Sequence, residues 1–443
     1  MIKKSIIKVY LERICIGVLV CLSQTTHALT LNETVAQTLQ TNPELMADIS
    51  RRLSTDHTVG QARAAYFPKV DVSLGIGREW SRNPSTPPEG VSLNRREQGI
   101  ALRQMIYDGF ATKNEVEKAQ LLVEAAAYQV ASSSERLGFE AANAFLEVLR
   151  YEDLLVITQE NLTSHQAIYQ QIESRSSSGV DRGADLEQAR GRVALSEANL
   201  MATKGNFADA KTSFQRVTGS LPEGELEKLG ERCCDGLPLT LNEGIETAFE
   251  GHPTIRSSNA RYEASLAETQ VANALFSPRL DLEVGSNMNH EVEGISGKNQ
   301  DVLAMIKLRY NLYNGGADQA RINETEYLTA QQKEIVLDMA RNIQEEVRLS
   351  WNELYTAIEN LPHLKLHAES AANSHSAYQQ QFDLGKRTLL DLLDMENEKF
   401  TSKANYINGY YQERISYYRL LASMGILVKT LNLPLNEASV VAP

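Results

Sequence analysis

The sequence predicts a mixed α and β fold that is mostly helical and is built from two internal structural repeats. Two observations lead to this prediction. A set of short motifs in the first half of the 443-residue chain recurs in the same order in the second half. Each half also contains two stretches with the alternation of β-strands, followed by one very long stretch with the spacing of an amphipathic helix. The chain therefore repeats one unit of strands and long helices.

The N-terminus, residues 1–28, has the features of a secretory signal peptide. A basic lead precedes the apolar stretch from Ile14 to Leu22, and Thr26-His27-Ala28 offers a small-residue cleavage site. We therefore expect the mature chain to begin near Leu29. The net charge of −13 argues against nucleic acid as a partner. The mature chain has no apolar run of about eighteen residues, so no membrane-spanning helix is expected.

Recurring motifs align the two repeats. Leu29-Thr-Leu-Asn-Glu33 recurs as Leu239-Thr-Leu-Asn-Glu243, and Tyr107-Asp-Gly109 matches Tyr313-Asn-Gly315. The offset falls from 210 positions (239 − 29) to 206 (313 − 107), so the net length change lies in one strand hairpin. The predicted organisation is repeat 1 at 29–220, a linker at 221–238 rich in Gly, Pro and charge, repeat 2 at 239–428 and a C-terminal tail at 429–443.

The first repeat begins with two helices, and Pro68 then stops the helical pattern. Val70 and Val72 alternate with polar residues, which predicts a strand at about 68–81 with one apolar face. A proline-containing loop at 82–89 precedes a returning strand at about 95–107. Helices are predicted at about 111–178 and about 183–219. The first of them carries a coiled-coil seam formed by Leu137, Ala141, Ala144, Val148, Tyr151 and Leu155.

The second repeat predicts the same elements. Strands are expected at about 278–290 and 300–313, separated by a glycine-containing loop. A long helix is expected at about 317–384 and a final helix at about 388–425. Pro362 lies inside the long helical pattern and predicts a kink there.

The strand count predicts an oligomer. Four strands cannot close a barrel, and open sheet edges are not tolerated in a bilayer. If the strands are embedded in a membrane, several chains must pool them, and a trimer supplies twelve strands. The long helices must also pool to bury their seams. The predicted fold is therefore a trimeric 12-stranded transmembrane β-barrel, with four strands per chain, continued by a long α-helical coiled-coil barrel.

Three cations lie opposite the apolar strand face, namely Arg103, Lys307 and Arg309. We expect them to face the barrel lumen and to tune its selectivity. The alternative is that they lie at the barrel rim.

The stretch Gly385-Lys-Arg-Thr-Leu-Leu-Asp-Leu-Leu-Asp394 predicts a helix–turn–helix tip. Gly385 separates two helical patterns, and Thr388 can cap the second one. Asp391 and Asp394 are three residues apart and project from one helix face. One interpretation is an acid pair that complements the helix dipole. In a trimer the same acids would form a carboxylate ring that attracts cations, which predicts a constriction.

No enzyme signature is present, so we predict no catalytic residue and no cofactor. His363 and His367 have a spacing that can bind a metal, but without an acid at a suitable offset they are interpreted as solvated residues, and no metal site is predicted. Cys233 and Cys234 are adjacent and are assigned no role.

These motifs resemble the TolC family of outer-membrane efflux and secretion channels. The resemblance covers essentially the whole mature chain and includes the strand entries Phe67-Pro68 and Ser277-Pro278. The run from Tyr378 to Glu398 is similar to the subgroup that serves type I secretion, including agglutination and large-adhesin export channels. The resemblance implies a homotrimer in the outer membrane of a Gram-negative bacterium, with outer-membrane lipid as a partner of its strands and with its helices in the periplasm. It also implies an inner-membrane ABC transporter, or an RND pump, with a periplasmic adaptor (membrane fusion protein).

The resemblance also assigns roles to residues of the tip. Asp391 and Asp394 match an aspartate constriction. Arg387 matches an arginine that ties the closed tips together, and Asp185 matches its acidic partner in the first repeat. Phe382 takes the place of a tyrosine of this latch and has no hydroxyl to donate, so the latch is expected to depend more on Arg387.

Three functions are considered on this basis. The first is a channel-tunnel for type I protein secretion, with a large adhesin or RTX-like protein as cargo. The second is the outer-membrane component of a small-molecule multidrug efflux pump. The third is a soluble periplasmic coiled-coil adaptor.

Overall fold

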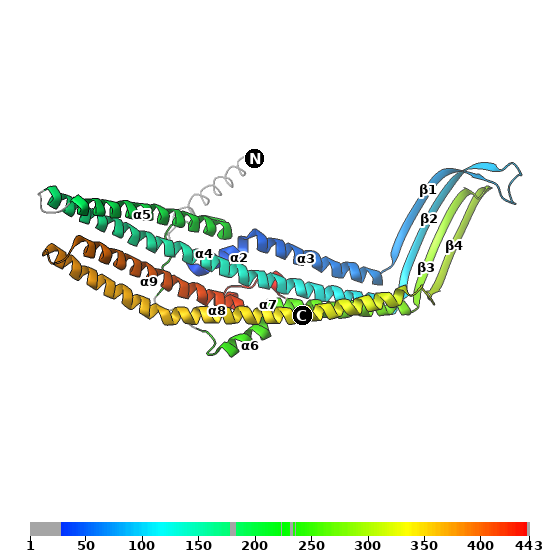
Figure 1. Ribbon diagram of the computed structural model, residues 1–443. Helices are drawn as coiled ribbons and strands as arrows, with labels where there is room; N and C mark the ends of the chain where they lie inside the picture. Colours follow the sequence, from blue (N-terminus) through cyan, green and yellow to red (C-terminus); the bar gives the residue numbers. More distant parts are fainter. Residues whose placement is uncertain (1–27, 178–182, 223, 231–233, 235, 441–443) are drawn as a thin grey trace, which may run out of the picture. The chain divides into compact units, whose positions relative to one another are not determined.

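The computed structural model in Figure 1 describes residues 28–177, 183–222, 224–230, 234 and 236–440. The predicted signal peptide lies outside these residues, except for Ala28. The chain divides into two compact units. The strand unit comprises Met46–Ser133, Thr247–Glu345 and the residues after Pro434, and the tip unit comprises the rest of the described chain. No helix of the described chain is long and apolar enough to cross a membrane.

The strand unit contains one antiparallel sheet in the order β1-β2-β3-β4. Its strands lie side by side in Figure 1 and span β1 Lys69–Ser81, β2 Val91–Tyr107, β3 Arg279–Val292 and β4 Ile295–Arg309. Strands of the two repeats therefore meet in one sheet, with β2 paired to β3. The chain supplies two edges to this sheet, β1 and β4.

The register confirms the predicted alternation. Val72 lies opposite Ile100, Ile100 opposite Ser286, and Ser286 opposite Val302, so these residues share one face. Val72 and Val302 are 69% and 74% exposed, although aliphatic side chains normally lie in a core. The other face carries most of the charged residues of the sheet, together with Leu303 and Met305. A sheet with an exposed aliphatic face needs an apolar environment or a partner on that side.

The second strand hairpin corrects the prediction. The loop expected between 290 and 300 is absent, because β3 and β4 remain paired as far as His290 opposite Lys298. The turn is reduced to Glu293 and Gly294, which both have positive φ values. Such a two-residue turn matches the twist of an antiparallel pair, so polar residues near it can stay in the ladder. In addition, β4 ends at Arg309 rather than near 313, and β2 begins at Val91 rather than near 95.

Helices continue the strand unit beyond the sheet. They are most of α3 (Pro43–Arg63), most of α7 (Pro253–Asn273) and the first parts of α4 (Ala111–Ser177) and α8 (Ala317–Asp383). The short 3-10 helices η1 (Ala64–Tyr66) and η2 (Ala274–Phe276) connect α3 and α7 to β1 and β3. Glu268 of α7 accepts hydrogen bonds of 2.6 Å from both Lys118 of α4 and Arg321 of α8, which ties three helices together.

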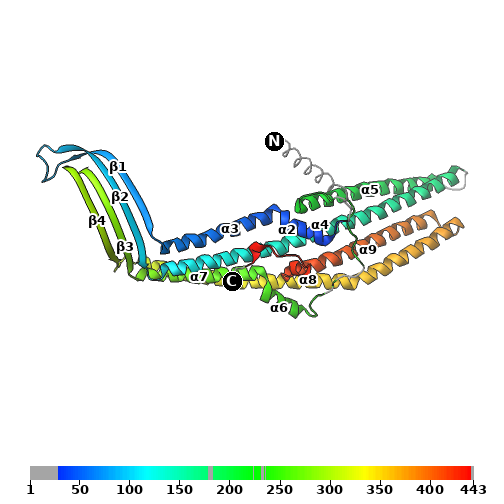
Figure 2. The same cartoon turned by 180° about the vertical axis from the view of Figure 1, so that it is seen from behind.

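The tip unit consists of helices. In Figures 1 and 2, α5 (Gly183–Thr218) lies along α4, and α9 (Leu389–Ser423) lies along α8. Shorter helices accompany them, namely α2 (Leu31–Thr41), the first part of α6 (Leu241–Gly251) and α10 (Leu427–Thr430). The predicted seam of the first long helix is confirmed, since Leu137, Ala141 and Val148 are buried. The assigned helix α8 runs through Pro362 without interruption, and the kink there stays a prediction.

Candidate functional site

The hairpin between α8 and α9 has the local structure that its sequence predicts. Gly385 adopts a left-handed conformation (φ +71°) two residues after α8 ends at Asp383, and this conformation favours glycine. Thr388 then forms a capping box with Asp391. The Asp391 backbone N–H donates to Thr388 Oγ1 (3.2 Å), and the Thr388 N–H donates to Asp391 Oδ2 (3.1 Å). The start of α9 is therefore set by residues 388–391 themselves.

Asp391 serves this cap with its carboxylate. The Thr388 hydroxyl, the Thr388 backbone N–H and the nearby Arg387 charge hold the pKa of Asp391 below its usual value. The carboxyl group therefore stays ionised at neutral pH. Within one chain, Asp391 therefore acts as a helix-end acid, which is the first of the two interpretations given for the acid pair.

Asp394 has a different partner. Its Oδ1 lies 3.3 Å from Nη2 of Arg192, which belongs to α5 of the first repeat. The Asp394 side chain is still 60% exposed, so it remains available to solvent and ions. The sequence analysis missed Arg192, because 202 positions separate the two residues and no motif connects them. Each of the two aspartates therefore has a partner within its own chain.

Arg387 is held within its own hairpin. Its Nε donates to Gln381 Oε1 (2.9 Å), and its guanidinium lies 4.2 Å from the centre of the Tyr378 ring. Asp185 lies in the first turn of α5 and is partly buried. Within the described part of the chain, no ion pair joins Arg387 to Asp185. Their role as a latch between tips therefore stays a prediction that concerns contacts between chains.

Phe382 packs in a small core that joins the two hairpins. The ring is 3% exposed and belongs to a cluster of buried residues from its own helix and three others. This tip core consists of Ile168 and Ile172 of α4, Ala189 of α5, Phe382 of α8 and Leu389, Leu392 and Leu393 of α9. The Arg175 guanidinium lies 4.9 Å from the Phe382 ring centre. Phe382 therefore contributes apolar packing, and its correspondence to a latch tyrosine stays a prediction.

A buried carboxylate adjoins this core. Glu396 of α9 is 2% exposed, and its Oε2 lies 2.6 Å from Nε2 of His375 and 3.4 Å from Nζ of Lys399. Its Oε1 accepts a long hydrogen bond (3.4 Å) from Asn161 of α4. Burial alone would raise the pKa of Glu396, but His375, Lys399 and Ser164 together hold it below the usual value. This ionised group connects α9 to α4, and nothing in the local sequence distinguished it from surface glutamates.

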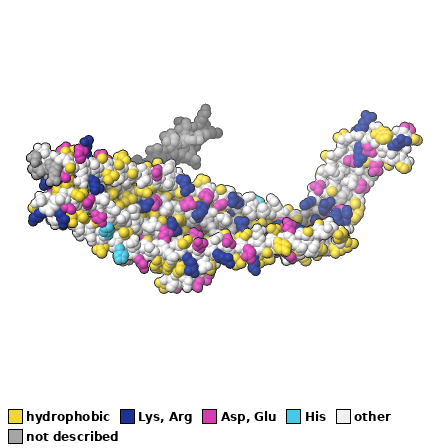
Figure 3. All heavy atoms as spheres, in the orientation of Figure 1, with side chains coloured by type: hydrophobic (Ala, Val, Ile, Leu, Met, Phe, Trp, Pro, Cys, Tyr) yellow, Lys and Arg dark blue, Asp and Glu magenta, His cyan; other side chains and the backbone are white. Residues whose placement is uncertain are grey.

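The three predicted barrel cations gather around two acids. Arg103, Lys307 and Arg309 lie within ion-pair distance of Glu283. Arg309 also binds Asp281 at 2.6 Å. In Figure 3, dark-blue Lys and Arg side chains gather on the visible face of the strand unit, close to where its strands meet its helices. The cations share the polar sheet face, as predicted, whereas the sequence analysis missed the acids. Whether this face lines a lumen stays a prediction.

Exposed aromatic rings occur at the strand ends that join the helices. Phe67, Phe110 and Tyr310 are 66%, 61% and 54% exposed, and Tyr107 packs edge-on against Phe110 with ring centres 5.7 Å apart. Aromatic rings of this kind are enriched at the two interfaces of membrane-spanning strands. The sequence signal was available, because these rings flank the predicted strand ends.

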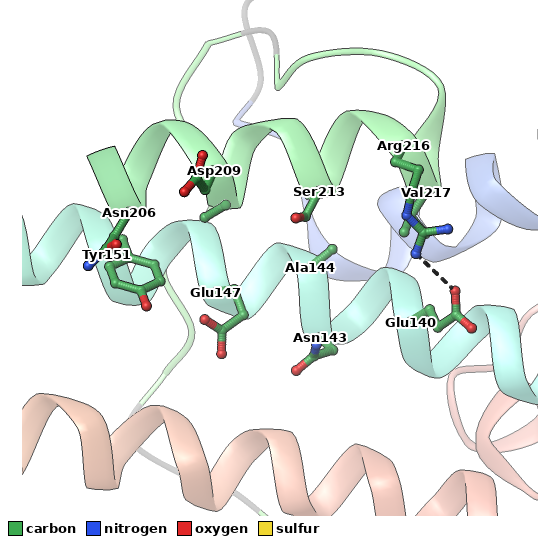
Figure 4. A pocket seen from close by; sticks show the side chains of 11 residues that line it. Glu140, Asn143, Ala144, Glu147, Tyr151, Asn206, Asp209, Ser213, Arg216 and Val217 are labelled. Atoms are coloured by element: carbon green, nitrogen blue, oxygen red, sulfur yellow. Dashed lines mark ion pairs between the residues drawn. The ribbon is translucent and has the colours of Figure 1, made fainter. Parts of the chain in front are cut away.

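Other features of the tip unit and its surroundings are assigned no ligand. A hollow of about 360 Å³ lies between α4 and α5, and Arg216 in its lining lies 3.5 Å from Glu140. Figure 4 shows the side chains that line it. Its acidic side chains match no particular ligand chemistry.

Among the described residues, no group of three or more His, Cys, Asp or Glu side chains could hold a metal ion, and His367 instead lies 2.8 Å from Glu398. Cys234 is disulfide-bonded, while Cys233 lies outside the described residues.

The comparison with known families decides the class of this protein. The family described as outer membrane efflux protein matches residues 34–220 and 244–426, which correspond to the two repeats. The chain belongs to this family. Outer membrane efflux proteins are transport channels of the Gram-negative outer membrane, so this membership excludes the soluble periplasmic adaptor.

Several relatives of this family span nearly the whole chain. The outer membrane protein TolC of Escherichia coli K12 is 24% identical over 436 residues, covering 94% of this chain and 86% of TolC. The outer membrane efflux protein BepC of Brucella suis is 21% identical, with 84% and 79% covered. The alkaline protease secretion protein AprF of Pseudomonas aeruginosa is 21% identical, with 92% and 87% covered.

Solved structures share the fold of this chain. A membrane protein from Pseudomonas aeruginosa has a TM-score of 0.80 at 18% identity, with 89% of this chain and 90% of that chain covered. A structure of CusC has a TM-score of 0.77 at 16% identity, with 89% and 91% covered. At these identities the likeness concerns the fold alone.

Proposed function

We propose that this outer membrane efflux protein is the channel of a type I protein secretion system. In this proposal three copies pool their strands into a twelve-stranded barrel, and their helices continue it as a conduit through the periplasm. An inner-membrane ABC transporter and its adaptor, a membrane fusion protein, deliver a large adhesin or RTX-like protein to the helix tips. Asp391 and Asp394 of each chain line the constriction at that entrance.

The tip hairpin carries this proposal. Its sequence from Tyr378 to Glu398 is similar to that of type I secretion channels. The relative AprF, whose name assigns it to protease secretion, matches 92% of the chain. The exposed aliphatic sheet face and the two free sheet edges support pooling of strands, because a closed barrel satisfies edge N–H and C=O groups in a bilayer.

The second candidate is small-molecule efflux with an RND pump in place of the ABC transporter. The relative CusC, named a cation efflux system protein, favours it. The sequence match to CusC covers 64% of this chain, the match to the efflux protein BepC covers 84%, and the match to AprF covers 92%. We therefore favour protein secretion.

The two candidates are separated by deleting the gene in the source bacterium and complementing it. We expect a large protein to disappear from the culture medium and cell surface, as measured by mass spectrometry, while inhibitory concentrations of antibiotics stay unchanged. Loss of drug resistance with normal protein secretion would favour the efflux pump. Loss of neither activity would contradict both candidates.

The latch is tested separately with Arg387→Ser. If Arg387 ties closed tips of neighbouring chains, this variant should leak, because serine can neither pair with Asp185 nor stack on an aromatic ring. We expect sensitivity to large antibiotics to rise by about fourfold or more, since losing a charged contact weakens a closed state by about 1–3 kcal/mol. Lys386→Ser is the matched control, because it removes the neighbouring exposed cation of the same turn. Equal sensitivity of the two variants and the wild type would argue against the latch.

A further inference from the structure

We propose that the outward end of the aliphatic sheet face binds the phosphate groups of lipopolysaccharide, the phosphorylated glycolipid of the outer leaflet. The site, a cationic row, contains the cations Arg96 of β2 and Lys298 of β4, with the imidazole of His290 of β3 between them and Arg78 of β1 two residues further toward the hairpin loops. This inference rests on the proposed function for one point, that the strand hairpins face the cell exterior.

The register places this row on one face. Ile76 lies opposite Arg96, Arg96 opposite His290, and His290 opposite Lys298, so the row crosses all four strands. Steps of two residues along each strand return to the same face. Successive steps lead from the cationic row to Leu74 and Met288, and then to Val72 and Val302. The row therefore continues the exposed aliphatic face rather than the polar one.

The cations of this row differ from those of the polar face. Arg95, the neighbour of Arg96 in sequence, binds Glu79 and Glu97 on the polar face. In the described part of the chain, no acidic side chain forms an ion pair with Arg96 or Lys298. Glu291, beside the row, lies 3.9 Å from His290 and also accepts a hydrogen bond from the Asn94 backbone N–H. The row thus carries positive charge in excess.

Depth in the membrane explains why such cations are tolerated. Lys and Arg on the lipid face are costly at the bilayer midplane, and this cost falls toward the interface. Four steps of two residues separate the row of Leu280 and Leu308 from the row of Leu74 and Met288. At about 6.8 Å per step this distance is about 27 Å along the strands, which a tilt of about 40° reduces to about 21 Å along the membrane normal. The cationic row is one step further, at about 26 Å, compared with the roughly 25 Å height of a barrel's apolar band. The cationic row then lies just beyond the hydrocarbon.

The chemistry at that depth identifies the ligand. Arg and Lys bind phosphate oxygens through charge-assisted hydrogen bonds. Adjacent strands are about 4.8 Å apart, so Arg96, His290 and Lys298 span about 10 Å, which suits a phosphorylated head group rather than a single ion. The acyl chains of the same lipid would lie along Leu74, Val72 and Val302. A phosphorylated glycolipid satisfies both halves of this surface.

The test compares binding of lipid A by the purified full-length protein with that of the double variant Arg96→Ser, Lys298→Ser. We expect the affinity for lipid A vesicles to fall by about tenfold or more in the variant, as expected for the loss of two charged contacts. Arg95→Ser, one position away on the polar face, is the matched control and should bind normally. The wild type should also bind dephosphorylated lipid A about tenfold more weakly, and this measurement requires no variant.

Other outcomes would overturn the inference. They are equal lipid A affinity of the wild type and the double variant, equal affinity for the phosphorylated and dephosphorylated lipid, and equal affinity for phosphatidylglycerol, which would indicate an inner-leaflet phospholipid instead. Single-channel conductance is recorded on the same preparations. If the double variant conducts normally and binds lipid A as the wild type does, the lipid site is contradicted but the proposed channel function is not.

Discussion

Replacing both Asp391 and Asp394 with alanine is expected to raise single-channel conductance and to weaken block by multivalent cations. In a trimer the change removes two negative charges from each of three chains at one constriction. Carboxylates that converge in a narrow opening bind multivalent cations far more strongly than isolated ones. We expect the blocking concentration of a trivalent cation to rise by about tenfold or more in planar bilayers.

The structure sharpens the controls for this experiment. The alanine variant also removes the capping interaction of Asp391 with Thr388, so the double asparagine variant, which removes charge but can keep the cap, should behave alike. Arg192→Gln frees Asp394 from its ion pair and should strengthen block, the opposite direction. Asp383→Asn changes an acid of the same hairpin that accepts hydrogen bonds from Gln171 and Gln379, and it should have a small effect. Unchanged block in both double variants would contradict the aspartate constriction.

The second large effect is expected from Glu135, a buried carboxylate of α4. It is 8% exposed and accepts hydrogen bonds from the backbone N–H groups of Leu427 (2.7 Å) and Val428 (3.3 Å) at the start of α10. Burial raises the pKa of Glu135 from 4.5 to about 7, although the two backbone hydrogen bonds oppose this. The carboxylate therefore attaches α10 to α4 at the cost of a buried charge at neutral pH.

The sign of the pH dependence follows from this raised pKa. Between pH 4.5 and pH 7 the folded chain holds a proton on Glu135 that the unfolded chain has released, so the free energy of unfolding falls as pH rises. The two pKa values correspond to roughly 3 kcal/mol across this window. Glu135→Gln should lack this loss, so its unfolding temperature should fall less than that of the wild type between pH 4.5 and pH 8.

Thermal unfolding of the purified protein, followed by circular dichroism over this pH range, measures the difference. Glu117→Gln is the matched control, because it neutralises an exposed carboxylate of the same helix and should follow the wild type. Parallel curves for the wild type and Glu135→Gln would show that this carboxyl group does not titrate in the window.

Local patterns predicted the parts of the fold that depend on neighbours in sequence. The alternation in β1 and β2, the capping of α9 by Thr388 and the left-handed Gly385 were all readable, because each depends on residues within a few positions. The second hairpin was mispredicted where Gly294 and polar residues suggested a loop. Ladder hydrogen bonds do not require apolar side chains, so composition alone misplaced the strand ends.

The candidate site was predictable only in part. The positions of Asp391 and Asp394 came from one short motif, but their partners did not. Arg192 reaches Asp394 from the other repeat, and Asn161 reaches Glu396 in the same way. A pairing across about two hundred positions has no signature in one sequence, because it depends on how the helices pack.

The sequence by itself determined that the chain is a duplicated unit of alternating strands and long helices, with a capped acidic tip in the second copy. These features follow from periodicity and capping, which are local properties of the chain. Only the tertiary structure decided which charges have partners. In that structure Asp391 forms the capping box of α9, Asp394 forms an ion pair with Arg192, and Phe382 packs in the tip core. It also shows that, in the described part of the chain, Arg96 and Lys298 beside the aliphatic sheet face form no ion pair with an acidic side chain. Partners of this kind are set by packing between distant segments, which no local pattern encodes.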